Sequence, residues 1–265
     1  MIEIRGVTKR FGDIVALDGI DLDVAAGEFV CLLGPSGCGK STLLNAVAGF
    51  IAPTSGEIVA NGQRVTGAGP ERGMVFQEYA LFPWMSVRAN IAFGLEMRGD
   101  AGARAKVDAL LATLHLAEFA ERFPKDLSGG MRQRVAIARV LALDSPILLM
   151  DEPFGALDAL TRRNLQDELL RIWLELHKTV LFVTHSIDES IYLADRIVVM
   201  TYRPGRIKAI VPVTFPRPRD ASGPDFNELK RALSSMVMEE QRRSVEGELG
   251  APASSPTGPD ASRVR

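Results

Sequence analysis

The segment Gly34–Ser41, GPSGCGKS, constrains the fold of this 265-residue chain more than any other feature. It follows the apolar run FVCLL and opens a stretch with helical spacing, KSTLLNAVAGF, the context in which a G-x-x-x-x-G-K-[ST] loop binds phosphate. Glycines let the backbone wrap an anion, N–H groups at the helix start face it, and Lys40 adds a positive charge. We therefore expect binding of a nucleoside triphosphate, with Ser41 placed to ligate Mg²⁺, through Gly34, Pro35, Ser36, Gly37, Cys38, Gly39, Lys40, Ser41 and Thr42.

The rest of the chain alternates strand-like and helix-like stretches, which predicts an α/β fold. The uninterrupted apolar runs Ile147–Met150 and Val180–Val183 are typical of strands buried on both faces of a mostly parallel sheet. We expect a P-loop NTPase core, an antiparallel β subdomain in the first third, and a helical insertion at about 86–143. One ATPase domain would then span residues 1–246, followed by a tail, 247–265, whose Pro, Ser, Gly and Ala content predicts disorder.

Composition narrows the classes of partner. The net charge of −2 and the pI near 6.0 lack the basic footprint of nucleic-acid binding, so we expect no nucleic-acid partner. No run reaches the roughly 18 consecutive apolar residues of a membrane span, so a membrane role would be peripheral. Two cysteines are too few for a disulfide framework, so we expect the protein to work in a reducing compartment. Cys31 is expected in the core, whereas Cys38 is either a redox switch or a small residue at a variable loop position.

Two adjacent carboxylates end the apolar run ILLM. Asp151 and Glu152 would lie at the carboxyl end of a buried strand, where open α/β sheets place ligands. Asp151 is the expected partner of Mg²⁺, either as a direct ligand or through an intervening group. Glu152 is suited to hold an attacking water as general base.

Several motifs occur together in a fixed order. After the loop at 34–41 come LSGGMRQR at 127–134, ILLMDEP, GALD at 155–158 and His185 in VTHS. This combination resembles the ATP-binding subunits of ABC transporters over roughly residues 1–215. The resemblance implies a head-to-tail homodimer with two ATP molecules at the interface.

The resemblance also implies roles for individual residues. Ser128 and the amides of Gly129 and Gly130 would contact the γ-phosphate bound by the partner copy, as glycines at a helix start favour. A plain loop-to-helix turn is the alternative. Asp158 matches the loop that crosses the dimer interface.

Three further residues match family positions around the nucleotide. Gln77, after the strand-like RGMVFQ, matches the glutamine that senses Mg²⁺ and water, and His185 matches the histidine that contacts the γ-phosphate. Phe11 matches the aromatic residue that stacks on adenine, with a buried core phenylalanine as the alternative.

The branch of the family is indicated by two stretches. LFPW at 81–84 and RPGRI…VPVTFPRPR at 203–219 resemble the nitrate, sulfonate and taurine importers of bacteria, which also use methionine at the position of Met131. Transmembrane permease subunits would dock near Phe82, Pro83 and Trp84, although ordinary packing of the helical insertion is the alternative. The chain would then lie on the cytoplasmic face of the bacterial inner membrane and serve a periplasmic or extracellular solute-binding protein indirectly. The competing hypotheses are a soluble ABC ATPase that is not coupled to transport, and an exporter subunit, which the stretch at 203–219 disfavours.

Overall fold

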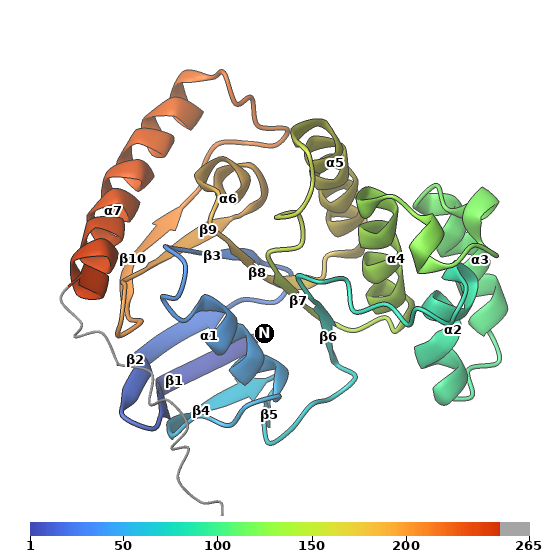
Figure 1. Ribbon diagram of the computed structural model, residues 1–265, viewed down its shortest axis with the longest axis horizontal. Coiled ribbons are helices and arrows are strands. Elements are labelled where there is room, and N and C mark those ends of the chain that lie inside the picture. The colour runs from blue at the N-terminus through green and yellow to red at the C-terminus, as the bar shows by residue number, and fades with distance from the viewer. Residues whose placement is uncertain (250–265) are drawn as a thin grey trace, which may run out of the picture.

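The computed structural model describes residues 1–249 and consists of two β-sheets with helices packed around them (Figure 1). The smaller sheet is antiparallel, as expected, and its strand order is β2-β1-β4-β5. Along IDLDV, Ile20, Leu22 and Val24 are buried while the two aspartates between them are exposed, which fits a half-buried strand. The strands of this sheet are β1 (Ile2–Phe11), β2 (Ile14–Val24), β4 (Ser55–Ala60) and β5 (Gln63–Arg64).

The larger sheet has six strands in the order β10-β9-β3-β8-β7-β6. Every neighbouring pair is parallel except β9 and β10, which are antiparallel. The chain order of these strands, with helices between them, confirms the predicted α/β class. The strands are β3 (Phe29–Leu33), β6 (Arg72–Val75), β7 (Ile147–Asp151), β8 (Thr179–Thr184), β9 (Arg196–Met200) and β10 (Ile207–Pro212).

The central strands of the larger sheet divide the core into two parts. On β3, Phe29 and Cys31 belong to one buried cluster, whereas Val30 and Leu32 belong to the other. Successive side chains of a strand point to opposite faces, so both faces of the sheet are covered. This is why the central strands read as continuous apolar runs without alternation.

The helices expected at about 86–143 lie together at one end of the molecule (Figure 1). They are α2 (Val87–Met97), α3 (Ala103–Thr113), the 3₁₀ turns Ala117–Phe119 and Pro124–Asp126, and α4 (Gly129–Ala142). Serine side chains cap two of them: Ser86 accepts from the Ala89 N–H at 3.2 Å, and Ser128 from the Met131 N–H at 3.3 Å. The group has its own apolar core, which includes Val87, Ile91, Leu95, Val107, Leu111 and Val135.

The remaining helices are α1 (Lys40–Ala48), α5 (Ala159–Leu176), α6 (Ile187–Leu193) and α7 (Pro224–Leu249). The last helix extends to Leu249, so residues 247–249, which the sequence predicted as the start of a disordered tail, are helical. Gly247 lowers helix preference by only about 1 kcal/mol, which a helix already docked on the core tolerates. The rest of the predicted tail, 250–265, lies outside the described residues. Across residues 1–249, each helix is too short or too polar to span a lipid bilayer.

Candidate active site

Four parallel strands end at one edge of the larger sheet. The strands β3, β8, β7 and β6 are neighbours, so the residues that follow their carboxyl ends meet there. After β3 comes the loop that leads to Lys40, after β7 comes Glu152, after β8 comes His185, and after β6 comes Gln77. The order of the strands in the sheet therefore brings these four residues to the same edge, although they are far apart in the sequence.

The loop at 34–39 curls around the ammonium group of Lys40. Lys40 is the first residue of α1, it is 4% exposed, and its Nζ donates to the carbonyl oxygens of Gly34 at 2.8 Å and Pro35 at 2.9 Å. A buried ammonium must have its donors satisfied, and these carbonyls supply that need. The charge is thus held inside the loop.

A cavity of about 510 Å³ opens beside this loop. Phe11, at one wall, is 50% exposed, so the alternative of a buried core phenylalanine is wrong. The cavity contains half of the site residues expected from the sequence: Phe11, Ser36, Gly37, Gly39, Lys40, Ser41, Thr42, Gln77 and Glu152. Three residues that were not expected complete it: Ile14, Ala16 and Arg203.

Ser41 and Asp151 face each other across this edge of the sheet. The Ser41 hydroxyl donates to Asp151 Oδ1 at 2.8 Å, and Gln77 lies in the wall of the same cavity. Burial raises the pKa of the Asp151 carboxyl, and the charge of Glu152 adds to that effect, while the Ser41 hydrogen bond and Lys40 oppose it. The side chains of Ser41, Gln77 and Asp151 all carry oxygen atoms, the ligand type that Mg²⁺ prefers.

Within residues 1–249, no group of three or more His, Cys, Asp and Glu side chains could hold a metal ion. Mg²⁺ at nucleotide sites commonly binds through one or two carboxylates together with substrate phosphates. The Ser41–Asp151 pair fits that mode, in which the nucleotide supplies part of the coordination.

Glu152 and His185 are in direct contact. The distance between His185 Nδ1 and Glu152 Oε2 is 2.8 Å. Glu152 follows β7 and His185 follows β8, and these two strands are neighbours in the sheet. The backbone of Glu152 has φ of 43°, a conformation that costs a non-glycine residue roughly 1–3 kcal/mol. Its N–H is held by the Val183 carbonyl at 3.0 Å. The sequence gives no sign of this turn, which aims the carboxylate toward the cavity.

The two cysteines are buried. Cys31 lies in the core, and Cys38 is fully buried within the phosphate loop. Burial raises the pKa of both thiols, well above the ordinary value for Cys31. A thiol that is both inaccessible and protonated reacts slowly, so the small-residue interpretation of Cys38 is favoured over the redox switch.

The LSGG segment lies apart from the cavity of its own chain. Ser128 is the N-cap of α4, and none of Ser128, Gly129 and Gly130 lines the cavity described above. Gly130 has a packing role that the sequence did not reveal, because a Cβ atom there would lie 2.6 Å from Thr161 Cγ2. Asp158 caps α5 by accepting from the Thr161 N–H at 3.0 Å, and that hydrogen bond lowers the pKa of its exposed carboxyl.

A second, apolar groove of about 550 Å³ runs between the larger sheet and the helices of residues 87–142. Phe82 lies in its wall and packs against Phe93 with ring centroids 4.6 Å apart. Trp84 is 71% exposed, and its ring is tilted by 42° to that of Phe82 at a centroid distance of 5.7 Å. Pro83 is also exposed, and neither Pro83 nor Trp84 lines the groove.

The comparisons with known proteins agree with this geometry. A family model described as ABC transporter matches residues 17–155, just over half of the chain. The chain is 54% identical over 213 residues to the taurine import ATP-binding protein TauB of Roseobacter denitrificans, covering 78% of this chain and 80% of that protein. It is 48% identical over 236 residues to the aliphatic sulfonates import ATP-binding protein SsuB of Bacillus licheniformis, covering 88% and 92%.

A solved structure is similar across the fold. The ATP-binding cassette MJ0796, in a dimeric post-hydrolysis state bound to ADP and Pi, superposes with a TM-score of 0.71 at 32% identity. The match covers 82% of this chain and all of that one. The chain therefore belongs to the ABC transporter family.

Proposed function

We propose that the chain is the ATP-hydrolysing subunit of a bacterial ABC importer for taurine, aliphatic sulfonates, nitrate or a related small solute. The observation that carries the proposal is the single cavity into which Lys40, Ser41, Gln77 and Glu152 converge beside the exposed ring of Phe11. The choice of solute is supported by TauB and SsuB, whose names state import of taurine and of aliphatic sulfonates.

Hydrolysis is phosphoryl transfer to water, so positioning and charge neutralisation do most of the work. Phe11 stacks on adenine, while Lys40 and the loop amides hold the phosphates. Glu152 accepts a proton from the attacking water, and His185, 2.8 Å from that carboxylate, contacts the γ-phosphate and fixes the carboxylate's orientation.

Mg²⁺ would be held by Ser41 and Asp151, with Gln77 nearby, and would neutralise charge on the phosphate oxygens. Burial raises the pKa of Asp151. The positive charge of a bound cation would lower that pKa and favour the ionised carboxylate. The Ser41–Asp151 hydrogen bond keeps the two oxygen ligands together before nucleotide arrives.

The active unit is a head-to-tail dimer in which each cavity is closed by the partner copy. The residues of the LSGG segment lie outside the cavity of their own chain, as expected of residues that contact the nucleotide of the partner copy: Ser128, Gly129 and Gly130. Asp158 would cross the interface near the same contacts. The dimeric state of MJ0796 supports this arrangement for a relative of this fold.

The apolar groove would receive a short helix from the transmembrane permease, on the cytoplasmic face of the bacterial inner membrane. Helix-in-groove recognition uses apolar anchors of the kind that Phe82 and its neighbours provide, and Pro83 and Trp84 lie at the same place in the chain. A periplasmic or extracellular solute-binding protein would be an indirect partner, and no nucleic acid is expected.

Co-purification and uptake test this proposal. The chain is expressed with the permease encoded beside its gene, and both association and ATP-dependent uptake of labelled taurine, an aliphatic sulfonate and nitrate are measured. Phe82→Ala should weaken the association, whereas Phe123→Ala, an exposed phenylalanine away from the groove, should leave it unchanged. ATP hydrolysis without association with any permease would favour the soluble ATPase instead.

A further inference from the structure

The loop between β9 and β10, residues 201–206, reaches the nucleotide cavity although no nucleotide motif of the sequence includes it. Arg203 in this loop lines the cavity together with Ser36, Gly37 and Lys40. The sequence marked this stretch, RPGRI, only as a feature of one branch of importers. Its place in the structure gives it a further role.

The backbone of the loop is pressed against both β2 and the phosphate loop. The Gly205 N–H donates to the Ala16 carbonyl at 3.0 Å, and the Asp18 N–H donates to the Gly205 carbonyl at 3.0 Å. A Cβ atom on Gly205 would lie 2.2 Å from the carbonyl oxygen of Cys38, so only glycine fits. This close approach fixes where the preceding residues can lie.

Arg203 is thereby set beside the phosphate loop. Its Nε donates to the Gly37 carbonyl at 3.2 Å, and a Cβ on Gly37 would lie 3.4 Å from its Nη2. The side chain is exposed to the cavity, and a guanidinium has five N–H donors in a fork that matches phosphate oxygens. The Nε–H donor holds the group on the loop, and the remaining N–H donors of this cavity-lining residue are available to an anion.

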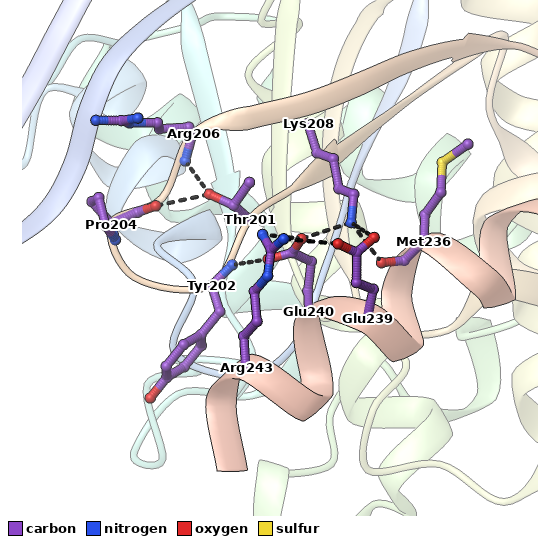
Figure 2. A network of polar contacts seen from close by, with 9 residues as sticks. All are labelled: Thr201, Tyr202, Pro204, Arg206, Lys208, Met236, Glu239, Glu240 and Arg243. Carbon is purple, nitrogen blue, oxygen red and sulfur yellow. Dashed lines mark hydrogen bonds and ion pairs between the residues drawn. The ribbon is translucent and has the colours of Figure 1, made fainter. Parts of the chain in front are cut away.

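The other side of the loop is anchored to the last helix (Figure 2). Glu240 of α7 is fully buried and accepts from the Tyr202 N–H at 3.0 Å, from Lys208 Nζ at 2.7 Å and from Arg243 at 3.1 Å. Thr201 Oγ1 closes the loop by donating to the Pro204 carbonyl at 2.8 Å and accepting from the Arg206 N–H at 2.9 Å. A buried carboxylate is costly unless several donors satisfy it, so this arrangement holds the start of the loop firmly.

We propose that Arg203 is a nucleotide-binding residue that contacts the polyphosphate, and that Glu240 is a positioning residue that holds its loop in place. Lys40 then acts from within the phosphate loop, and Arg203 acts from outside it. This inference rests on the proposed nucleotide cavity and extends it to the last helix of the described chain.

The test measures the affinity of the full chain for ADP with Mg²⁺ by isothermal titration calorimetry, because ADP is not turned over. Arg203→Ala should weaken binding about 10-fold, the size of one charge-assisted contact. Arg206→Ala is the matched control: it removes the same charge from the same loop, but Arg206 pairs with Asp18 and does not line the cavity. Arg206→Ala should change the affinity less than about 2-fold.

Two results would overturn the role of Arg203. One is an affinity of Arg203→Ala equal to that of the parental chain. The other is equal weakening by Arg203→Ala and Arg206→Ala, which would show only a long-range effect of charge. If Arg203→Ala does not fold by circular dichroism, Arg203→Gln, which keeps a side-chain amide but loses the charge, decides in the same way.

A double-mutant cycle tests Glu240. Glu240→Gln should weaken ADP binding about 3-fold, and Arg203→Ala with Glu240→Gln should bind no more weakly than Arg203→Ala alone. Additive losses would show that Glu240 acts on general stability and not through Arg203. If the parental chain itself binds no ADP, the proposed function fails; if it binds ADP and hydrolyses ATP while Arg203→Ala matches it, only the present inference fails.

Discussion

The nucleotide cavity and the start of α4 are built on different principles. The cavity collects side chains from the phosphate loop, from the ends of strands of the larger sheet and from β1 and β2 of the smaller sheet, all within one chain. The start of α4 carries the most recognisable motif of the helical region, yet its serine and glycines lie outside that cavity. Substitutions in the cavity and at the start of α4 should therefore have different effects.

The largest effect is expected at Glu152, which belongs to the cavity. Glu152→Gln removes the proton acceptor but keeps the shape, so the hydrolysis rate should fall about 1,000-fold while ATP affinity is retained. Phosphate release measures the rate, and light scattering with ATP should show a stable dimer. Glu121→Gln, an exposed carboxylate of the helical region, is the control. Parental turnover in Glu152→Gln would exclude Glu152 as the base.

Lys40→Ala should act on binding itself. Its ammonium is the charge held inside the phosphate loop, so its loss should weaken ATP affinity about 100-fold by calorimetry. Lys106→Ala, an exposed lysine of α3, should leave the affinity unchanged. An unaltered affinity of Lys40→Ala would contradict the assignment of the phosphate loop.

At the start of α4, the two glycines should respond differently. Gly130→Ala forces a contact with Thr161 and should lower the free energy of unfolding by about 2 kcal/mol. Gly129→Ala meets Leu157 and the Tyr79 hydroxyl only at 3.4 Å and should cost less than about 1 kcal/mol. Chemical denaturation measures both, and Thr161→Ser should restore part of the loss in Gly130→Ala. Equal stabilities of the two glycine variants would show that α4 and α5 can move apart.

Met131→Gln should have the smallest effect. Met131 is partly buried against the core of the helical region, and the contacts expected of LSGG belong to Ser128 and the glycine amides. The ATPase rate should stay within about 2-fold of the parental rate, because Met131 does not line the nucleotide cavity. A large gain or loss would give its side chain a role in hydrolysis.

Much of the fold could be predicted from the sequence, because its signals are local. The apolar runs of β3, β7 and β8 and the helical spacing of α2 and α4 predicted the elements, and the phosphate loop has a fixed spacing. The expected neighbours Lys40, Ser41, Gln77 and Glu152 do share one cavity. Phe11 is exposed there, which its sequence alone left open.

What could not be predicted depends on contacts between distant segments. Arg203 enters the cavity because Gly205 packs on Cys38 and because Glu240 holds the loop, and these residues are far apart in the chain. The left-handed backbone of Glu152 and the packing of Gly130 on Thr161 likewise have no local signal. The tail was predicted to begin at residue 247 from its Pro, Ser, Gly and Ala content, but α7 continues through residues 247–249.

The two outer strands of the six-stranded sheet limit how copies of this chain can meet. β6 has four residues, too few to template a long pairing. β10 carries Lys208 and ends at Pro212, which has no N–H to offer a neighbouring strand. Sheet-to-sheet association at these edges is therefore disfavoured, and aggregation through strand addition is discouraged.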